Sequence, residues 1–359
     1  CIRDRFYNTD GPGQMVQSAR SMFRLNHEPG YDIYQQQWDP TLPASWKQPV
    51  GEKGRPAAHQ DFRDSNAVML GVIPNEKERW QRLNNYYLNC MQDVDRHIND
   101  LLLELDRLGI EDDTIVIFTS DHGELAGAHG LVGKGATAYR EQNHVPLVIV
   151  HPAHQGKQRC KAVTSHVDIA ATLLGISGAT TGDMEELPGH DLSPLLDEAG
   201  TADTDALRSG ALYNFNMLGY IDSGFMQSIG DYLAKGGKPT ELQKQGYKPD
   251  LKKRGAIRTV YDGRYKFSRY FSPLDHHVPN TLEVLLAAND LELFDLKNDP
   301  LEVSNLAVAP KAHPELILAM NEKLNGLITD EVGEDIGQML PDVKGMRWTS
   351  GSSIEDYRP

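Results

Sequence analysis

Two short runs of continuous hydrophobic residues constrain the fold more than any other feature of the chain. Residues 114–120 (TIVIFTS) and 145–150 (VPLVIV) are rich in β-branched residues and have the length of single strands. Continuous rather than alternating hydrophobicity is typical of strands that are buried on both faces. Because such strands need helices on both sides, the pattern predicts an α/β architecture with a sheet between helices.

Helical periodicity surrounds these two runs. Between Trp80 and Leu108, hydrophobic residues recur three and four positions apart, and Gly109 follows at a position where glycine commonly ends a helix. Residues 165–178 (SHVDIAATLLGISG) contain a second, shorter helix, for which Asp168 is the expected N-terminal cap. The alternation of strand, loop and helix supports the α/β prediction.

The C-terminal part of the chain has a different pattern. Residues 256–271 (AIRTVYDGRYKFSRYF) predict a β-hairpin with an Asp-Gly turn, residues 291–307 one more strand, and residues 313–328 an amphipathic helix. We therefore predict a catalytic domain over 1–244, a small antiparallel subdomain with a helix over 245–330, and a tail over 331–359.

Composition excludes several functional classes. The 359 residues include 36 Lys and Arg against 51 Asp and Glu, a net charge of −15, which argues against binding to nucleic acid or to an anionic membrane surface. Three cysteines, Cys1, Cys90 and Cys160, are too few and too widely spaced for a disulfide framework or a cysteine zinc site. No run reaches the ~20 apolar residues that span a bilayer.

The glycine-rich run that follows the first strand holds the candidate site residues. Asp121 and His122 stand where the strand ends, the place where ligands collect in open α/β sheets. A carboxylate beside an imidazole can bind a divalent cation, and glycines around Lys134 allow the loop to bring an ammonium to the same place. His129 is a further candidate for contact with substrate. Alternatively, Asp121 caps a turn, His122 and Lys134 are surface residues, and His129 either lies behind the residues that contact substrate or is exposed.

Four ordered blocks resemble the sulfatase family of the alkaline phosphatase superfamily. They are FTSDHGELAGAHGLVGKGATAYREQNHVPLVIVHP, SHVDIAATLLGISG, LPGHDLSPLL and ELFDLKNDPLEVSNLA, and they extend over residues ~75–310. The resemblance implies an alkaline-phosphatase-like mixed sheet between helices, with a small C-terminal antiparallel sheet plus helix. It also implies that Asp121 and His122 are metal ligands and that Lys134 contacts the sulfate group.

The same resemblance implies cofactors. The family's cation is usually Ca²⁺, and the imidazole of His122 keeps Mn²⁺ or Mg²⁺ open as alternatives. Sulfatases also use a formylglycine nucleophile, made within a C-x-P/A-x-R signature near the N-terminus. Cys1 does not fit this signature because Arg3 replaces the Pro or Ala, and Cys90 and Cys160 have no Arg four residues later. We therefore expect the nucleophile, and roughly the first hundred residues of a sulfatase, to be absent from this chain.

The functional prediction is metal-dependent hydrolysis of a small sulfate monoester to an alcohol and sulfate, by a protein that this chain represents only in part and that is inactive in this form. One alternative is a phosphonate or phosphate ester hydrolase of the same superfamily, and another is a non-catalytic binding protein. A periplasmic or secreted location is typical of the family. The sequence identifies neither the particular ester nor the oligomeric state.

Overall fold

The structure is a computed structural model that describes residues 36–154, 156–179, 187–216, 220, 222–275 and 278–335. Cys1 and the tail beyond residue 335 lie outside these residues. The α-helices are α2 (Ala57–Leu70), α3 (Lys77–Leu108), α4 (Arg140–Asn143), α5 (Asp168–Ile176), α7 (Leu195–Glu198), α8 (Ser223–Ala234), α9 (Leu282–Ala288) and α10 (Pro314–Glu331). The strands are β1 (Val116–Thr119), β2 (Leu147–Val150), β3 (Ala211–Phe215), β4 (Ala256–Tyr261), β5 (Tyr265–Phe271) and β6 (Asn289–Asp295). Short 3-10 helices include Glu111–Asp113, Ala128–Gly130, Pro239–Gln245, Leu306–Val308 and Pro310–Ala312.

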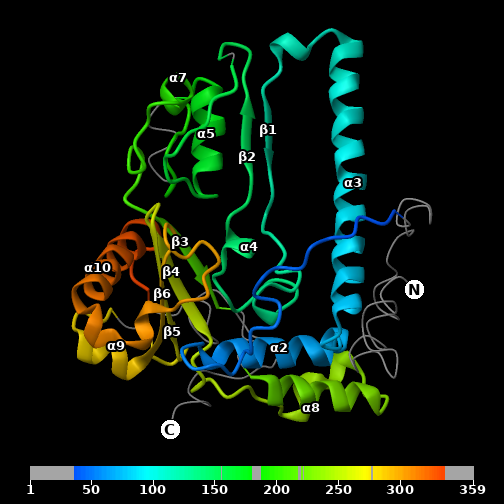
Figure 1. The fold of residues 1–359 in the computed structure, drawn as a ribbon, viewed down its shortest axis with the longest axis vertical. Coiled ribbons are helices and arrows are strands. Elements are labelled where there is room, and N and C mark those ends of the chain that lie inside the picture. The colour runs from blue at the N-terminus through cyan, green and yellow to red at the C-terminus, as the bar shows by residue number, and fades with distance from the viewer. Residues whose placement is uncertain are drawn as a thin grey trace.

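A four-stranded antiparallel sheet in the order β3-β4-β5-β6 forms the centre of the C-terminal half. Its hydrophobic side chains alternate between two faces, as the period of a strand requires. One face packs against α9 and α10 through Phe267, Leu293 and Leu324, all fully buried. The helices α9 and α10 lie together on this side of the sheet in Figure 1. The predicted hairpin, the next strand and the closing helix are thus confirmed.

The opposite face of this sheet covers the glycine-rich loop. Ile257, Tyr270 and Phe294 of the sheet share one buried cluster with Phe62 of α2 and Leu131 of the loop. The helices α2 and α8 pack side by side next to this cluster (Figure 1). The loop between β1 and β2 is therefore held in a hydrophobic environment built from three distant parts of the chain.

The two strands of the first prediction pair with each other, antiparallel, with Ile117 opposite Ile149. Their expected burial on both faces is wrong for the described residues, since Phe118, Val148 and Val150 are 39%, 49% and 58% exposed. The reason is that β1 and β2 form an isolated two-stranded ribbon in the described part of the chain. Figure 1 shows the long helix α3 running beside this ribbon.

The helix α3 begins and ends as expected. It ends at Leu108, and Gly109 has the left-handed conformation with φ of 63°. Trp80 and Leu83 near its start are buried, whereas Met91, Val94, Leu101, Leu102, Leu103 and Leu108 are each exposed by about half or more. No helix among the described residues is both long and apolar enough to cross a membrane.

Two sequence-based expectations need revision. Asp168 is not the N-cap of α5, because the helix begins at Asp168 itself. Its buried carboxylate instead accepts hydrogen bonds from the backbone N–H of Ser165 and His190 and forms an ion pair with Arg208. The four-stranded sheet also takes β3 from before residue 245, so the proposed division of the chain at that residue stays a prediction.

Candidate active site

Asp121 and His122 lie immediately beyond the end of β1, as predicted. Asp121 Oδ1 accepts a hydrogen bond of 2.9 Å from the backbone N–H of His122, and its Oδ2 lies 3.2 Å from His122 Nε2. The Asp121 side chain is 82% exposed and that of His122 36%. The two side chains therefore converge at the surface.

Hydrogen bonding fixes the protonation of the imidazole. His122 Nδ1 lies 2.9 Å from the carbonyl oxygen of Gly123, and because a carbonyl can only accept, Nδ1 carries the proton. In the neutral ring the Nε2 lone pair then faces Asp121. The pKa of the Asp121 carboxyl is lowered, first by the hydrogen bond from the backbone N–H of His122 and also by the charge of Lys134. The carboxyl is thus held in the ionised form that binds cations.

The spacing of this pair fits a divalent cation. Oxygen ligands of Ca²⁺ lie at about 2.3–2.6 Å, so two ligands at right angles are separated by roughly 3.3–3.7 Å. The 3.2 Å between Asp121 Oδ2 and His122 Nε2 lies next to the short end of this range. Both atoms are accessible, and the neutral ring offers a lone pair at Nε2, which a ligand pair requires.

A close backbone contact sets the direction of the loop. The backbone N–H of Gly123 donates a hydrogen bond of 2.7 Å to the carbonyl oxygen of Gln142. A Cβ atom at Gly123 would overlap the carbonyl oxygen of Glu141. The glycine is therefore required by close approach of two backbone segments, and this contact fixes where Asp121 and His122 leave the strand.

Glu124 closes the loop that returns the chain to Lys134. Its Oε1 accepts hydrogen bonds from the backbone N–H of Ala126 at 3.0 Å and of Gly133 at 2.5 Å. The backbone N–H of Leu125 also donates to Gly133 O at 3.0 Å. Lys134 is exposed, and its ammonium lies near enough to contribute to the lowered pKa of Asp121. The loop thus brings Lys134 to the same region as Asp121 and His122.

A buried amide holds the segment that follows Lys134. Gln142 Oε1 accepts from the backbone N–H of Gly135 at 2.8 Å, and Nε2 donates to Gly135 O, Thr137 O and the Tyr213 hydroxyl. Gln142 is 3% exposed. A fully used buried amide specifies one conformation, so Gln142 restricts the backbone beside the lysine.

His129 lies apart from these exposed groups, because it is completely buried. Its ring stacks on Tyr139 with centroids 3.5 Å apart, and Nδ1 lies 2.9 Å from Gln48 Oε1. Burial, together with the nearby charges of Arg55 and Lys266, lowers the pKa of His129 to about 3. This position disfavours the predicted contact between His129 and substrate.

A buried polar network beside His129 was not found from the sequence. Arg55 Nε donates to His59 Nδ1, His59 Nε2 lies 2.9 Å from the Tyr270 hydroxyl, and Tyr270 donates to Glu292 Oε2 at 2.7 Å. Tyr139 donates to the other oxygen of Glu292. Burial raises the pKa of Glu292 to about 7, although its hydrogen bonds oppose the rise. The sequence signal that was available for Glu292 is the alternation of β6 side chains between two faces, which places Glu292 on the same face as Phe294.

Comparison with known proteins shows what this chain resembles. Residues 22–179 match the family model described as Sulfatase. The chain is 39% identical to arylsulfatase K of Bos taurus over 113 residues, which are 32% of this chain and 20% of that protein. It is 27% identical to the endo-4-O-sulfatase of Bacteroides thetaiotaomicron over 307 residues, 84% of this chain and 50% of that protein. The chain thus spans half or less of the length of these relatives.

Solved structures share the fold. A 2-O GAG sulfatase superposes with a TM-score of 0.55 at 18% identity, over 84% of this chain and 54% of that one. The phosphonate monoester hydrolase of Silicibacter pomeroyi superposes with a TM-score of 0.56 at 20% identity, over 89% and 56%. The chain therefore shares the α/β fold of these two hydrolases. The match of residues 22–179 and the named relatives show that part of the chain is similar to sulfatases.

Proposed function

We propose that this chain contributes the Asp121, His122 and Lys134 part of the active site of a sulfuric ester hydrolase, which converts a sulfate monoester to an alcohol and sulfate. The observation that carries the proposal is the 3.2 Å approach of Asp121 Oδ2 to His122 Nε2, in a loop that also brings Lys134 near. The similarity of residues 22–179 to the Sulfatase family model supports the reaction class.

Each residue has a distinct role in this proposal. Asp121 and His122 hold the cation through a carboxylate oxygen and a neutral imidazole nitrogen, and Ca²⁺ is the first candidate, with Mn²⁺ or Mg²⁺ as alternatives. When bound, the cation supplies a Lewis acid that polarises an ester oxygen. Lys134 carries a fixed positive charge that neutralises the negative charge developing on the sulfate oxygens.

The described residues do not fit a formylglycine. Of the described cysteines, Cys90 and Cys160 are each followed four residues later by Val94 and Thr164, where the signature needs an arginine. Cys90 is also inside α3, which is not a strand end. We therefore assign no step of the reaction to a formylglycine among the described residues.

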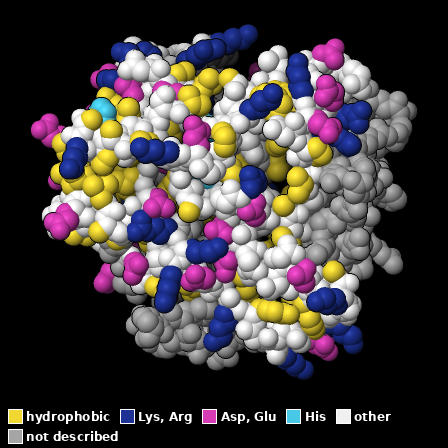
Figure 2. All heavy atoms as spheres, turned by 60° about the horizontal axis from the view of Figure 1, so that its bottom comes forward, with side chains coloured by type: hydrophobic (Ala, Val, Ile, Leu, Met, Phe, Trp, Pro, Cys, Tyr) yellow, Lys and Arg dark blue, Asp and Glu magenta, His cyan; other side chains and the backbone are white. Residues whose placement is uncertain are grey.

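The proposal names only the class of the substrate. A small sulfated molecule, free in solution outside the cytoplasm, is consistent with the exposure of Asp121 and Lys134. Figure 2 shows Lys and Arg side chains interspersed with Asp and Glu on one face of the molecule, which agrees with a small ligand better than with a polyanionic macromolecule.

The first experiment measures cation binding by calorimetric titration of the protein with Ca²⁺ and with Mn²⁺. We expect Asp121→Ala and His122→Ala each to weaken binding at least tenfold. The matched control is Asp112→Ala, which removes an exposed carboxylate from Glu111–Asp113 at the other end of β1. Equal binding by wild type and Asp121→Ala would refute the ligand assignment.

The second experiment distinguishes the reaction classes. Because this chain is expected to be inactive in this form, hydrolysis of 4-nitrophenyl sulfate and of a phenylphosphonate monoester is compared in a full-length protein that contains it and in the Lys134→Ala variant of that protein. Turnover of the sulfate ester that falls at least a hundredfold in Lys134→Ala supports the proposal. Turnover of the phosphonate ester alone would favour the phosphonate hydrolase, and saturable binding of sulfate esters with no turnover would favour a binding protein.

A further inference from the structure

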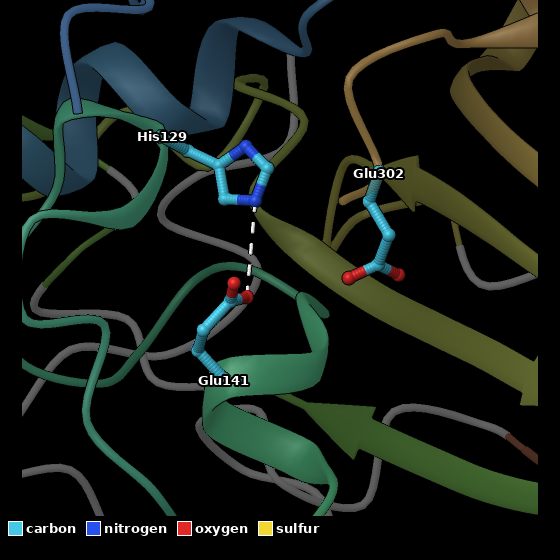
Figure 3. A group of neighbouring side chains, drawn as sticks. All are labelled: His129, Glu141 and Glu302. Carbon is cyan, nitrogen blue, oxygen red and sulfur yellow. Dashed lines mark ion pairs between the residues drawn. The ribbon is translucent and has the colours of Figure 1, made fainter. Parts of the chain in front are cut away.

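Three acceptor groups converge in the interior, apart from the exposed pair. His129 Nε2, one carboxylate oxygen of Glu141 and one of Glu302 all lie within 4.8 Å of one another. His129 and Glu302 are 0% and 1% exposed, and the Glu141 side chain is 27% exposed. Figure 3 shows the ring nitrogen of His129 and the two carboxylates pointing toward one another from three separate parts of the chain.

The imidazole presents a lone pair to this group. Nδ1 lies 2.9 Å from Gln48 Oε1, and an amide oxygen only accepts, so Nδ1 carries the proton and Nε2 does not. A hydrogen bond on one ring nitrogen that orients the other is the usual support of a metal-binding histidine.

Two of these acceptors lack donors. His129 Nε2 and Glu141 Oε2 are buried without a hydrogen-bond partner, and they lie 3.8 Å apart, too far for a shared proton to join them. Glu302 Oε1 forms an ion pair of 2.5 Å with Lys266 Nζ, so Lys266 balances the charge of one of the two carboxylates.

The backbone is strained at two of the three residues. His129 has φ of 57° and Glu302 has φ of 53°, in the left-handed region that non-glycine residues rarely adopt. Hydrogen bonds from outside the group hold both in place. Arg55 donates to His129 O at 2.9 Å, and the backbone N–H of Arg140 donates to Glu302 Oε2 at 2.7 Å. The strain is thus maintained at the residues whose side chains converge.

A cavity lies beside one member of the group. It has a volume of about 290 Å³ and is lined by Arg55, Tyr139, Glu292 and Glu302 among others. Glu302 thus belongs both to the cavity wall and to the convergent group.

We propose that His129, Glu141 and Glu302 form a second metal site, which binds Zn²⁺ through His129 Nε2 and one oxygen of each glutamate. One imidazole and two carboxylates match the ligands of Zn²⁺, and three protein ligands in a buried place favour a low coordination number over the six that Mn²⁺ or Mg²⁺ requires. Lys266 keeps its ion pair with Glu302 and donates a hydrogen bond to Ala138 O at 2.9 Å. The ion therefore binds without breaking this ion pair. The role is structural, because the ion ties the β1–β2 loop to the turn after β6.

The test separates this site from the exposed one. Protein carrying both Asp121→Ala and His122→Ala is titrated with Zn²⁺ by calorimetry, and its thermal unfolding is measured with and without Zn²⁺. We expect one equivalent to bind and to raise the unfolding temperature. Failure of the proposed sulfatase function would leave this result unchanged, because the exposed ligands are already removed.

Matched variants assign the ligands. In the same background, Glu141→Gln keeps the ion pair of Lys266 with Glu302 and should weaken Zn²⁺ binding at least tenfold. Glu52→Gln changes an exposed carboxylate that lines the same cavity and should not alter binding. Co²⁺ in place of Zn²⁺ should give the visible absorption of a four-coordinate ion. No binding in the background protein, or equal binding in Glu141→Gln with an unchanged circular dichroism spectrum, would overturn the proposal.

Discussion

The buried carboxyl of Glu292 makes the pH dependence of stability a quantitative test of the core. Its pKa is about 7 in the folded protein against an ordinary value of 4.5. The folded state therefore binds this proton more tightly than the unfolded state does. A carboxyl with a raised pKa contributes most to stability below pH 4.5, and that contribution is lost as the pH rises through 7. At about 1.4 kcal/mol per pH unit, the whole effect is about 3 kcal/mol.

The assay is urea unfolding at pH 5 and at pH 8, for wild type and for Glu292→Gln. We expect the wild type to lose about 2–3 kcal/mol more than the variant between these two pH values. The glutamine keeps an oxygen that accepts from the Tyr270 hydroxyl but has no proton to release. Comparing the two proteins cancels the contribution of His59, whose pKa is lowered by burial and whose effect has the opposite sign.

The control is Glu283→Gln, which changes an exposed carboxylate on α9 and should show the wild-type pH dependence. If Glu292→Gln loses as much stability as the wild type between pH 5 and pH 8, the carboxyl is ionised at little cost and the reasoning from burial is wrong.

Four further tests concern the packing. Gly123→Ala, which forces a methyl group into a backbone carbonyl, should destabilise the protein by about 1–3 kcal/mol. By contrast, Gly326→Ala, in a helix with open space around it, should stabilise by about 0.5–1 kcal/mol. Arg208→Met leaves two buried carboxylates without their partner and should cost about 3–5 kcal/mol, whereas a cost below about 1 kcal/mol would show that solvent reaches them. Leu324→Ala should cost about 2–5 kcal/mol and Leu301→Ala, at a position 46% exposed, less than about 1 kcal/mol. Urea unfolding measures all four, and equal costs for the two leucines would contradict the assigned core.

Local sequence patterns predicted the regular elements well. The end of α3 at Gly109, the hairpin of β4 and β5, and α10 all follow from periodicity and turn residues that lie next to one another in the chain. By contrast, β3 was missed. It pairs Leu212 with Val260, and no pattern near residues 211–215 indicates a partner so far along the chain. The burial of β1 and β2 was overestimated. The hydrophobicity of a strand shows that it can be buried, but it does not show which neighbouring elements cover it.

The site was predictable where its residues are neighbours in the sequence. Asp121 and His122 converge because they follow each other at a strand end, and Lys134 returns because glycines allow the loop to close. The location of His129 was not predictable, because Gln48, Arg55 and Tyr139 decide it from other segments. Glu302 lies in the same region, although it follows Arg140 by 162 positions in the sequence. Such placements depend on tertiary contacts that a single sequence does not reveal.

The distance along the chain between the β1–β2 loop and its anchors has a consequence for biosynthesis. Arg140 and Glu302 are 162 positions apart, so a ribosome adding roughly 5–20 residues per second needs about ten to thirty seconds between them. During that interval the nascent loop is without the contact that orders it, and it is open to proteases and chaperones. Slow translation of the codons between the two positions should therefore lower the yield of folded protein more than slow translation after Glu302.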